Sequence, residues 1–218
     1  AGAPLPRRVP RAAWPGALRF RAVWVVGFAF VGLEGASFAT GQFIVPFGES
    51  VNGWSILLAG VVGMMFVFPS TFGGPVGGSV AERFRNHRTQ FVAATVAGAA
   101  VLALLPWAGL ATALLIGVVF SFAYGFLYAV MYVLPHFWRA VPPEEIPIAI
   151  GLFNAIQLTG GAVVSFLFGW VVSIRSYSVG WEFLAAAMLG TLLVLLWLPA
   201  TERADSAGPL PAAGPAPP

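Results

Sequence analysis

Six stretches of mostly apolar residues, each close to the length that a helix needs to cross a lipid bilayer, dominate this sequence. About 20 mostly apolar residues span the hydrocarbon layer as a helix. With 59% apolar and only 9% charged residues, the chain falls outside the range of soluble domains. We therefore expect an integral membrane protein whose crossings cover residues 22–47, 54–81, 90–107, 109–134, 146–173 and 181–199.

The apolar stretches are predicted to be helices and not strands of a β-barrel. Barrel strands read as short segments of about 10 residues with alternating polarity, whereas the run from Phe183 to Trp197 shows no alternation. The expected fold class is an all-α membrane protein with six transmembrane helices. An even number of crossings places both chain ends on the same side.

The distribution of the arginines predicts the orientation in the membrane. Ten of the eleven arginines fall before the first crossing, between the second and third, or after the fourth and sixth; Arg175 alone falls on the opposite side. Because cytoplasmic loops carry the excess of positive charge, we expect a multi-pass protein of the cell (plasma) membrane with both termini in the cytoplasm. The arginines are too few and too close to the membrane ends to favour a nucleic-acid partner; the expected surroundings are the lipid bilayer.

The chain divides into three parts by composition. Residues 1–21, rich in proline and arginine, read as a cytoplasmic linker, residues 22–200 as a six-helix transmembrane domain, and residues 201–218 as a disordered cytoplasmic tail. The chain has no cysteine, and His87 and His136 lie in different loops, so no metal site and no cofactor is expected.

Glu34 is a carboxylate in the middle of the first crossing, and no arginine falls inside a comparable segment. A charge at bilayer depth costs about 3 kcal/mol or more, so such a side chain usually faces a protein interior or a watery cavity. We expect Glu34 either to couple proton movement to solute movement or to contact a cationic group of the substrate. The alternative is a neutral carboxyl group that is hydrogen-bonded inside the bundle for packing alone.

Ranked by polarity, the six crossings repeat with a period of three. The first and fourth are the most polar and could line a cavity, the second and fifth are rich in glycine, and the third and sixth are uniformly apolar. This order is what two three-helix repeats of inverted topology would give, as in many secondary transporters. The polar side chains of the first and fourth crossings are Glu34, Ser37, Thr40, Gln42, Ser121, Tyr124, Tyr128 and Tyr132.

Several other polar side chains are candidates for contact with a solute. Asn154 and Gln157 are three residues apart and so share a helix face, but interhelical amide bonds are also common in membranes. Gln42 lies nearer the outer end of the first crossing. Tyr124 and Tyr128, spaced four apart on one face, could stack on a ring of the substrate or simply pack against neighbouring helices.

The loop between the second and third crossings carries a recognisable order of residues. Gly78 is followed by three spacers, Glu82, Arg83, Phe84 and then a basic cluster with Arg85 and Arg88. This order resembles the signature loop of the major facilitator superfamily, in which glycine, three residues, Asp-Arg, one residue, glycine and basic residues follow the second helix. Glu82 stands where the family usually has aspartate, and Arg85 where it usually has glycine. The alternative is a short basic cytoplasmic loop.

The resemblance covers one six-helix half of a twelve-helix transporter. The arginine-rich leader resembles the linker that joins the two halves, so the C-terminal half is the expected assignment, with the second six-helix half in the same polypeptide or in a partner chain. Charged contacts between the loop and the opposite half would close one access state.

The expected function is that of a secondary active transporter half, which moves a small-molecule substrate by alternating access, either with proton coupling or without it. No enzyme signature is present: without lysine there is no P-loop site, and neither histidine lies within a crossing. A six-helix channel or a non-transporting membrane scaffold or sensor are the alternatives. A channel usually shows a filter segment or rings of charge, which we do not find in the sequence.

Overall fold

The structure is a computed structural model that describes residues 18–84, 86–138 and 141–197. Most of the predicted linker and the whole predicted tail lie outside these residues. Within them the chain is all-helical, with no strand, and six helices are long and apolar enough to cross a membrane. The all-helical fold class and the number of membrane-length helices are confirmed, and six such helices are expected of an integral membrane protein.

The helix bounds lie within a few residues of the predicted ones. The first apolar helix is α2 (Arg21–Ser50), and the second is divided into α3 (Ile56–Met65) and α4 (Ser70–Arg83). The third is α5 (His87–Leu104) with the 3₁₀ turn η1 (Leu105–Trp107), and the fourth is α6 (Leu110–Val133) with η2 (Leu134–Phe137). The fifth is η3 (Pro143–Glu145) with α7 (Ile146–Ile174), and the sixth is α8 (Tyr177–Leu192) with η4 (Leu193–Trp197).

Short polar segments begin three of these helices. The side chains of Ser55, Asn86 and Ser176 each accept a hydrogen bond, at 3.3–3.4 Å, from the backbone amide three residues further on. Such N-caps satisfy one of the amides that a helix start leaves without a partner. Gly53, between α2 and α3, has a φ of 64°, a left-handed conformation that favours glycine.

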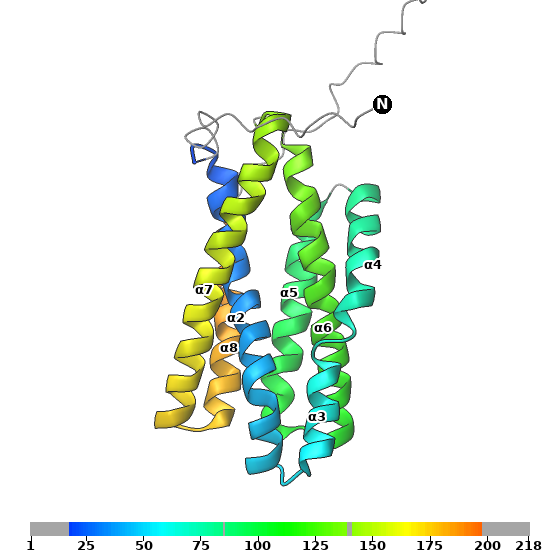
Figure 1. Cartoon of the computed structure of the whole chain (residues 1–218), viewed down its shortest axis with the longest axis vertical. Coiled ribbons are helices and arrows are strands. Elements are labelled where there is room, and N and C mark those ends of the chain that lie inside the picture. Colours follow the sequence, from blue (N-terminus) through cyan, green and yellow to red (C-terminus); the bar gives the residue numbers. More distant parts are fainter. Residues whose placement is uncertain (1–17, 85, 139–140, 198–218) are drawn as a thin grey trace, which may run out of the picture.

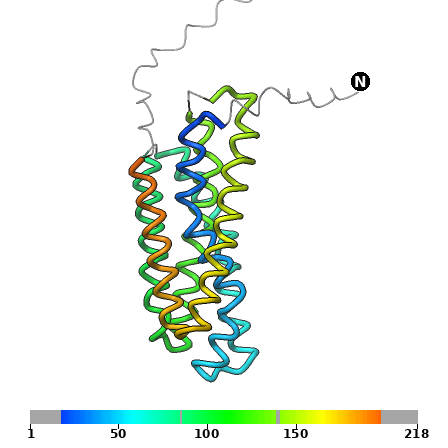
Figure 2. Tube along the Cα trace, turned by 90° about the vertical axis from the view of Figure 1, so that its left-hand side faces the viewer, coloured from blue at the N-terminus to red at the C-terminus, as the bar shows by residue number. Residues whose placement is uncertain are grey.

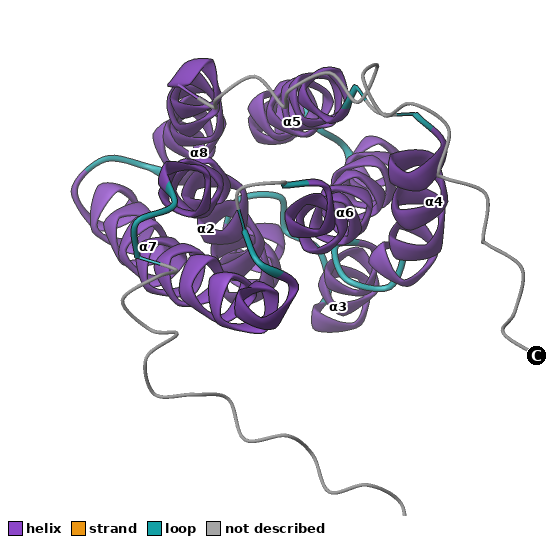
Figure 3. Cartoon of the chain, turned by 90° about the horizontal axis from the view of Figure 1, so that it is seen from above, coloured by secondary structure: helices purple, strands orange, loops and turns teal. Residues whose placement is uncertain are grey.

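The helices form an elongated bundle with α2 and α6 in its middle (Figure 3). α2 packs along α7 and α8, and α6 packs along α4 and α5. α5 and α8 contact each other on one side of the bundle, with α8 at its edge in Figure 2. Of the six apolar helices in the described chain, α2 is the most buried and the one that contains α7 the least.

Neighbouring helices that pack most closely run in the same direction. In Figure 1, α2 and α7 both descend from the end at which the described chain begins, whereas α4 and α6 both ascend toward it. Arg21, Arg83 and Arg88 lie at the ends of helices on this side, and Arg175 lies at the opposite side, after α7. The described arginines are therefore separated as the sequence analysis expects.

Glycines in the second crossing let α4 approach α6 closely. A methyl group at Gly73 or Gly77 would overlap the backbone of α6, and one at Gly125 of α6 would overlap the backbone of α4. Gly74 and Gly78 point the other way, where a methyl group would meet no described atom within 4 Å. One side of α4 is thus fitted to α6, while its other side is open.

The second crossing is interrupted, which the sequence analysis did not anticipate. Residues 66–69 form turns between α3 and α4, and Pro69 cannot donate a backbone hydrogen bond. The hydroxyl group of Ser121, on α6, accepts a hydrogen bond from the Ser70 amide and donates one to the Val67 carbonyl, both at 3.0 Å. Ser121 therefore supplies partners for backbone groups at the break and does not line a cavity.

Candidate functional site

Glu34 lies inside the bundle, near the middle of α2, with 2% of its surface exposed. Its side chain packs against Gly161 of α7, where a Cβ atom would lie 2.7 Å from Glu34 Cγ. Tyr124 of α6 donates a hydrogen bond to Glu34 Oε2 at 3.1 Å. Among the described residues Glu34 has no ion-pair partner. Three helices thus enclose a carboxyl group that no positive charge of the described chain compensates.

A polar ladder extends from Glu34 along α6 toward the end of the bundle where α7 begins. The rings of Tyr124 and Tyr128 have their centroids 5.7 Å apart, and those of Tyr128 and Tyr132 are 4.9 Å apart. The hydroxyl groups of Tyr128 and Tyr132 are hydrogen-bonded at 3.1 Å. The shared face that the spacing of four predicts for these tyrosines is therefore confirmed.

The ladder crosses from α6 to α7 at Asn154. Tyr132 donates a hydrogen bond to Asn154 Oδ1 at 3.0 Å, and Gln157 Nε2 donates to the same oxygen at 2.7 Å. Asn154 and Gln157 share a face, as predicted. Gln157 is fully buried, and its Oε1 atom has no hydrogen-bond partner among the described residues. We call the set of Glu34, the three tyrosines, Asn154 and Gln157 the polar ladder.

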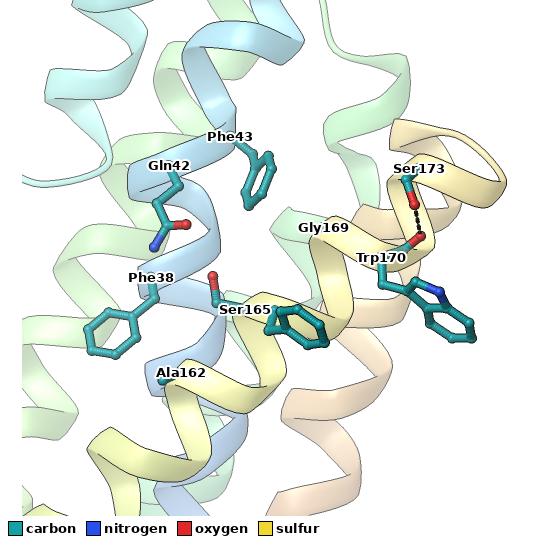
Figure 4. A pocket seen from close by; sticks show the side chains of 9 residues that line it. Phe38, Gln42, Phe43, Ala162, Ser165, Gly169, Trp170 and Ser173 are labelled. Carbon is teal, nitrogen blue, oxygen red and sulfur yellow. Dashed lines mark hydrogen bonds between the residues drawn. The ribbon is translucent and has the colours of Figure 1, made fainter.

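Gln42 does not join the polar ladder. It follows Glu34 by two helical turns on α2 and lines an open groove of about 760 Å³ between α2 and α7 (Figure 4). Ser165 of α7 is buried, its hydroxyl points toward α2 between Phe38 and Phe43, and it has no hydrogen-bond partner in the described part of the chain. The other residues that line the groove are Ala162, Phe166, Gly169, Trp170 and Ser173.

The loop between α4 and α5 presents its charged side chains to the outside. Glu82, Arg83 and Arg88 are exposed, and Arg85 lies outside the described residues. Within the described loop, Glu82 and Arg83 form no ion pair with each other or with a neighbour. The loop is held instead by bonds to its backbone: His87 Nε2 lies 3.0 Å from the Ala81 carbonyl oxygen and Gln90 Nε2 lies 2.8 Å from that of Phe84.

Tyr132, which the sequence analysis includes among the polar side chains of the fourth crossing, joins the other tyrosines to Asn154. Ser165 has a clear place in the site, although the sequence analysis did not single it out. Ser165 lies one helical turn beyond Gly161 on α7, and only the packing of α7 on α2 reveals that its hydroxyl faces the groove.

Comparisons with known proteins identify no family for this chain. No protein-family model matches the chain, and no curated protein matches it in sequence. No group of three or more His, Asp or Glu side chains that could hold a metal ion occurs among the described residues. The site is therefore defined by its own chemistry: a buried, uncompensated carboxyl group, a ladder of hydroxyl and amide groups, and an aromatic groove beside them.

Proposed function

We propose that the chain is one half of a secondary active transporter of the major facilitator type, which moves a small solute across the cell membrane by alternating access. The polar ladder carries this proposal. A passive membrane anchor has no use for an uncompensated carboxyl group at the middle of a membrane-length helix, and ionisable residues there usually mark a pathway for solutes or protons. In this bundle the group is connected through Tyr124 to a line of polar side chains along α6 and α7.

The helix contacts support two inverted three-helix repeats as part of the proposal. When the first crossing is matched with the fourth and the second with the fifth, the contact of α2 with α7 corresponds to the contact of α6 with α4. When the third crossing is also matched with the sixth, the contact of α2 with α8 corresponds to that of α6 with α5, and the contact of α5 with α8 corresponds to itself. Secondary transporters often place their sites at the interface of such repeats.

Open helix faces and unpaired charges support a second six-helix half, in the same polypeptide or in a partner chain. The crossings that contain α4 and α7 are the least buried of the six in the described chain. Small residues let membrane helices approach one another, and Gly74 and Gly78 leave the outer side of α4 free for such contact. Glu82, Arg83 and Arg88 are exposed, so they can pair with the opposite half and hold one access state closed.

In this proposal both termini lie in the cytoplasm, because the described arginines other than Arg175 lie at the end of the bundle where α2 starts. Glu34, Tyr124, Tyr128, Asn154 and Gln157 face the pathway, and Gln42 contacts the solute from the groove. Glu34 either carries the coupled proton or contacts a positive group of the solute.

Uptake assays of the Glu34→Gln variant test the proposal. A panel of labelled small solutes is offered to a host that expresses the chain together with its second six-helix half, and to vesicles prepared from that host, with and without a pH gradient. We expect at least one solute to accumulate against its gradient, and its uptake to fall by about tenfold or more in the variant, the effect of losing one charge-assisted hydrogen bond. Ala97→Ser, on the exposed side of α5, serves as the control.

If the Glu34→Gln variant accumulates the solute at the same rate and with the same pH dependence as the unmodified chain, the carboxyl group is not part of the pathway. Solute movement that only follows its own gradient would favour a channel, and no movement of any solute would favour a scaffold or sensor.

A further inference from the structure

The hydrogen bonds of the polar ladder have a direction that restricts what can bind beside it. Tyr132 donates its proton to Asn154 Oδ1, so Tyr128 must be the donor in the bond between the two tyrosines. Tyr124 donates its proton to Glu34 Oε2. A tyrosine hydroxyl has one proton to donate, so all three tyrosines have used theirs within the protein.

Near Glu34, several oxygen atoms that can accept a hydrogen bond receive none from the described residues. Glu34 Oε1 and the Tyr128 oxygen accept no hydrogen bond from any described residue, and neither does the fully buried Gln157 Oε1. Asn154 keeps an amide nitrogen that can donate, but it lies at the far end of the ladder beside Tyr132. A partner for this cluster must therefore bring N–H or O–H donors, and a donor with a positive charge would also compensate the carboxylate.

The described chain offers no positive charge of its own to this cluster. Lysine is absent from the sequence, and the described arginines all lie at or beyond helix ends: Arg19, Arg21, Arg83 and Arg88 on one side of the bundle and Arg175 on the other. The tyrosine rings add a further attraction, since a cation close to an aromatic face is stabilised by the electrons of the ring. An anionic solute would find no positive charge among the described residues of this cluster, and it would meet the carboxyl group of Glu34.

The groove between α2 and α7 begins about one helical turn from Glu34 along both helices. Phe38 and Gln42 follow Glu34 at intervals of four residues on α2, and Ser165 follows Gly161, which touches Glu34, by four on α7. One helical turn is about 5.4 Å, so the nearest part of the groove lies within the length of a small molecule from the carboxyl group. Its volume of about 760 Å³ is typical of a small-molecule site.

The lining of the groove suits an apolar body with one or two polar substituents. Phe38, Phe43, Phe166 and Trp170 supply aromatic surface, and the hydroxyl of Ser165 points into the groove without a partner among the described residues (Figure 4). Ser165 is 4% exposed, so its unpaired hydroxyl costs stability unless a ligand or water binds it. A polyol, which needs many polar contacts, would find few in this groove.

We propose that the transported solute is a small organic cation, whose ammonium group binds at Glu34 and Tyr128 and whose apolar or aromatic body lies in the groove between α2 and α7. This inference rests on the proposed transport function. Tyr124 already donates a hydrogen bond to Glu34 Oε2, so the ammonium group binds at Oε1 or replaces the Tyr124 hydroxyl at Oε2.

Equilibrium binding to the full chain in lipid nanodiscs tests the proposal without requiring transport. The probes are phenethylammonium, the neutral 2-phenylethanol and the anionic 3-phenylpropionate, which share one ring and differ in charge. A charge-assisted hydrogen bond contributes about 1.5–3 kcal/mol, so we expect the cation to bind about 10- to 100-fold more tightly than the alcohol and the anion to bind most weakly. In Glu34→Gln the cation and the alcohol should bind about equally.

A second pair of variants tests the groove. Ala162 is exposed and lines the groove, whereas Ala97 is exposed on α5, away from it. Ala162→Phe should weaken both the cation and the alcohol about tenfold or more by filling the groove, and Ala97→Phe should leave both unchanged. Equal binding of the cation and the alcohol to the unmodified chain, or a preference that survives in Glu34→Gln, would overturn the proposal. So would tight binding that Ala162→Phe leaves unaltered.

Failure of this inference and failure of the transport function give different results. Cation-selective binding without accumulation of any solute would refute transport and leave the ligand class standing. Accumulation of a neutral or anionic solute, unaffected by Glu34→Gln, would refute the ligand class and leave transport standing.

Discussion

The seam between α4 and α6 gives a quantitative prediction with a matched control in the adjacent residue. Gly77 faces the backbone of α6, whereas Gly78 faces away from it, and no described atom lies within 4 Å of a methyl group built at Gly78. Both glycines lie in the last turns of α4. Replacing each by alanine adds the same methyl group to the same helix, so the difference between the two variants isolates the contact with α6.

The expected magnitude follows from the geometry of the seam. A Cβ atom at position 77 would lie 2.8 Å from the Phe126 Cα and carbonyl carbon atoms, whereas carbon atoms in contact are about 3.5–4.0 Å apart. Helices α4 and α6 must therefore move apart by about 1 Å, and the van der Waals attraction between them then falls by a quarter to a half. Such overpacking costs about 1–3 kcal/mol. The methyl group at position 78 meets no atom, and alanine favours the helix over glycine by up to about 1 kcal/mol.

Reversible unfolding of the purified chain in mixed micelles, with increasing SDS and circular dichroism as the signal, measures both variants. We expect Gly77→Ala to lower the free energy of unfolding by about 1–3 kcal/mol, and Gly78→Ala to leave it unchanged or raise it slightly. Equal losses in the two variants, or a loss confined to Gly78→Ala, would refute the close packing of α4 on α6.

Two further predictions concern side chains that join helices through hydrogen bonds. Ser121→Ala should lower the free energy of unfolding by about 1–2 kcal/mol, because it removes two bonds at the break between α3 and α4; Thr71→Ala, which loses only a local bond to Phe68, should cost under half as much in the same assay. Tyr132→Phe should leave stability within about 1 kcal/mol but reduce solute uptake, since it interrupts the ladder between Tyr128 and Asn154. Full uptake by Tyr132→Phe would show that the continuity of the ladder is not required.

Much of the fold could be predicted from the sequence because the length and polarity of a membrane helix are one-dimensional properties. The six crossings appear within a few residues of their predicted bounds. The face shared by Tyr124, Tyr128 and Tyr132 also followed from helix periodicity alone. Pro69 marked a possible break in the second crossing, but proline is tolerated within membrane helices when neighbouring groups supply the lost partners, so the sequence did not require the interruption.

The parts of the site that could not be predicted depend on how each helix is rotated about its axis. Sequence spacing places Asn154 and Gln157 on one face, but only the packing of α7 shows that this face meets Tyr132. Ser121 lies one turn before the tyrosines on their helix, yet it bonds to α4 and stays out of the ladder. Gln42 shares a stripe of α2 with Glu34 but reaches only the groove.

The central claim is that the groove between α2 and α7 faces water inside the membrane. Labelling of single cysteines tests this claim directly, because the chain has no cysteine of its own. Ala162→Cys places a thiol in the groove, and Ala97→Cys places one on the exposed side of α5. A charged, membrane-impermeant methanethiosulfonate reacts with the thiolate, which forms where water reaches the sulfur.

In intact membranes that contain the expressed protein, we predict that Ala162→Cys reacts roughly tenfold or more faster than Ala97→Cys. Equal rates, or a faster reaction at position 97, would contradict the claim and turn this face of the bundle toward lipid.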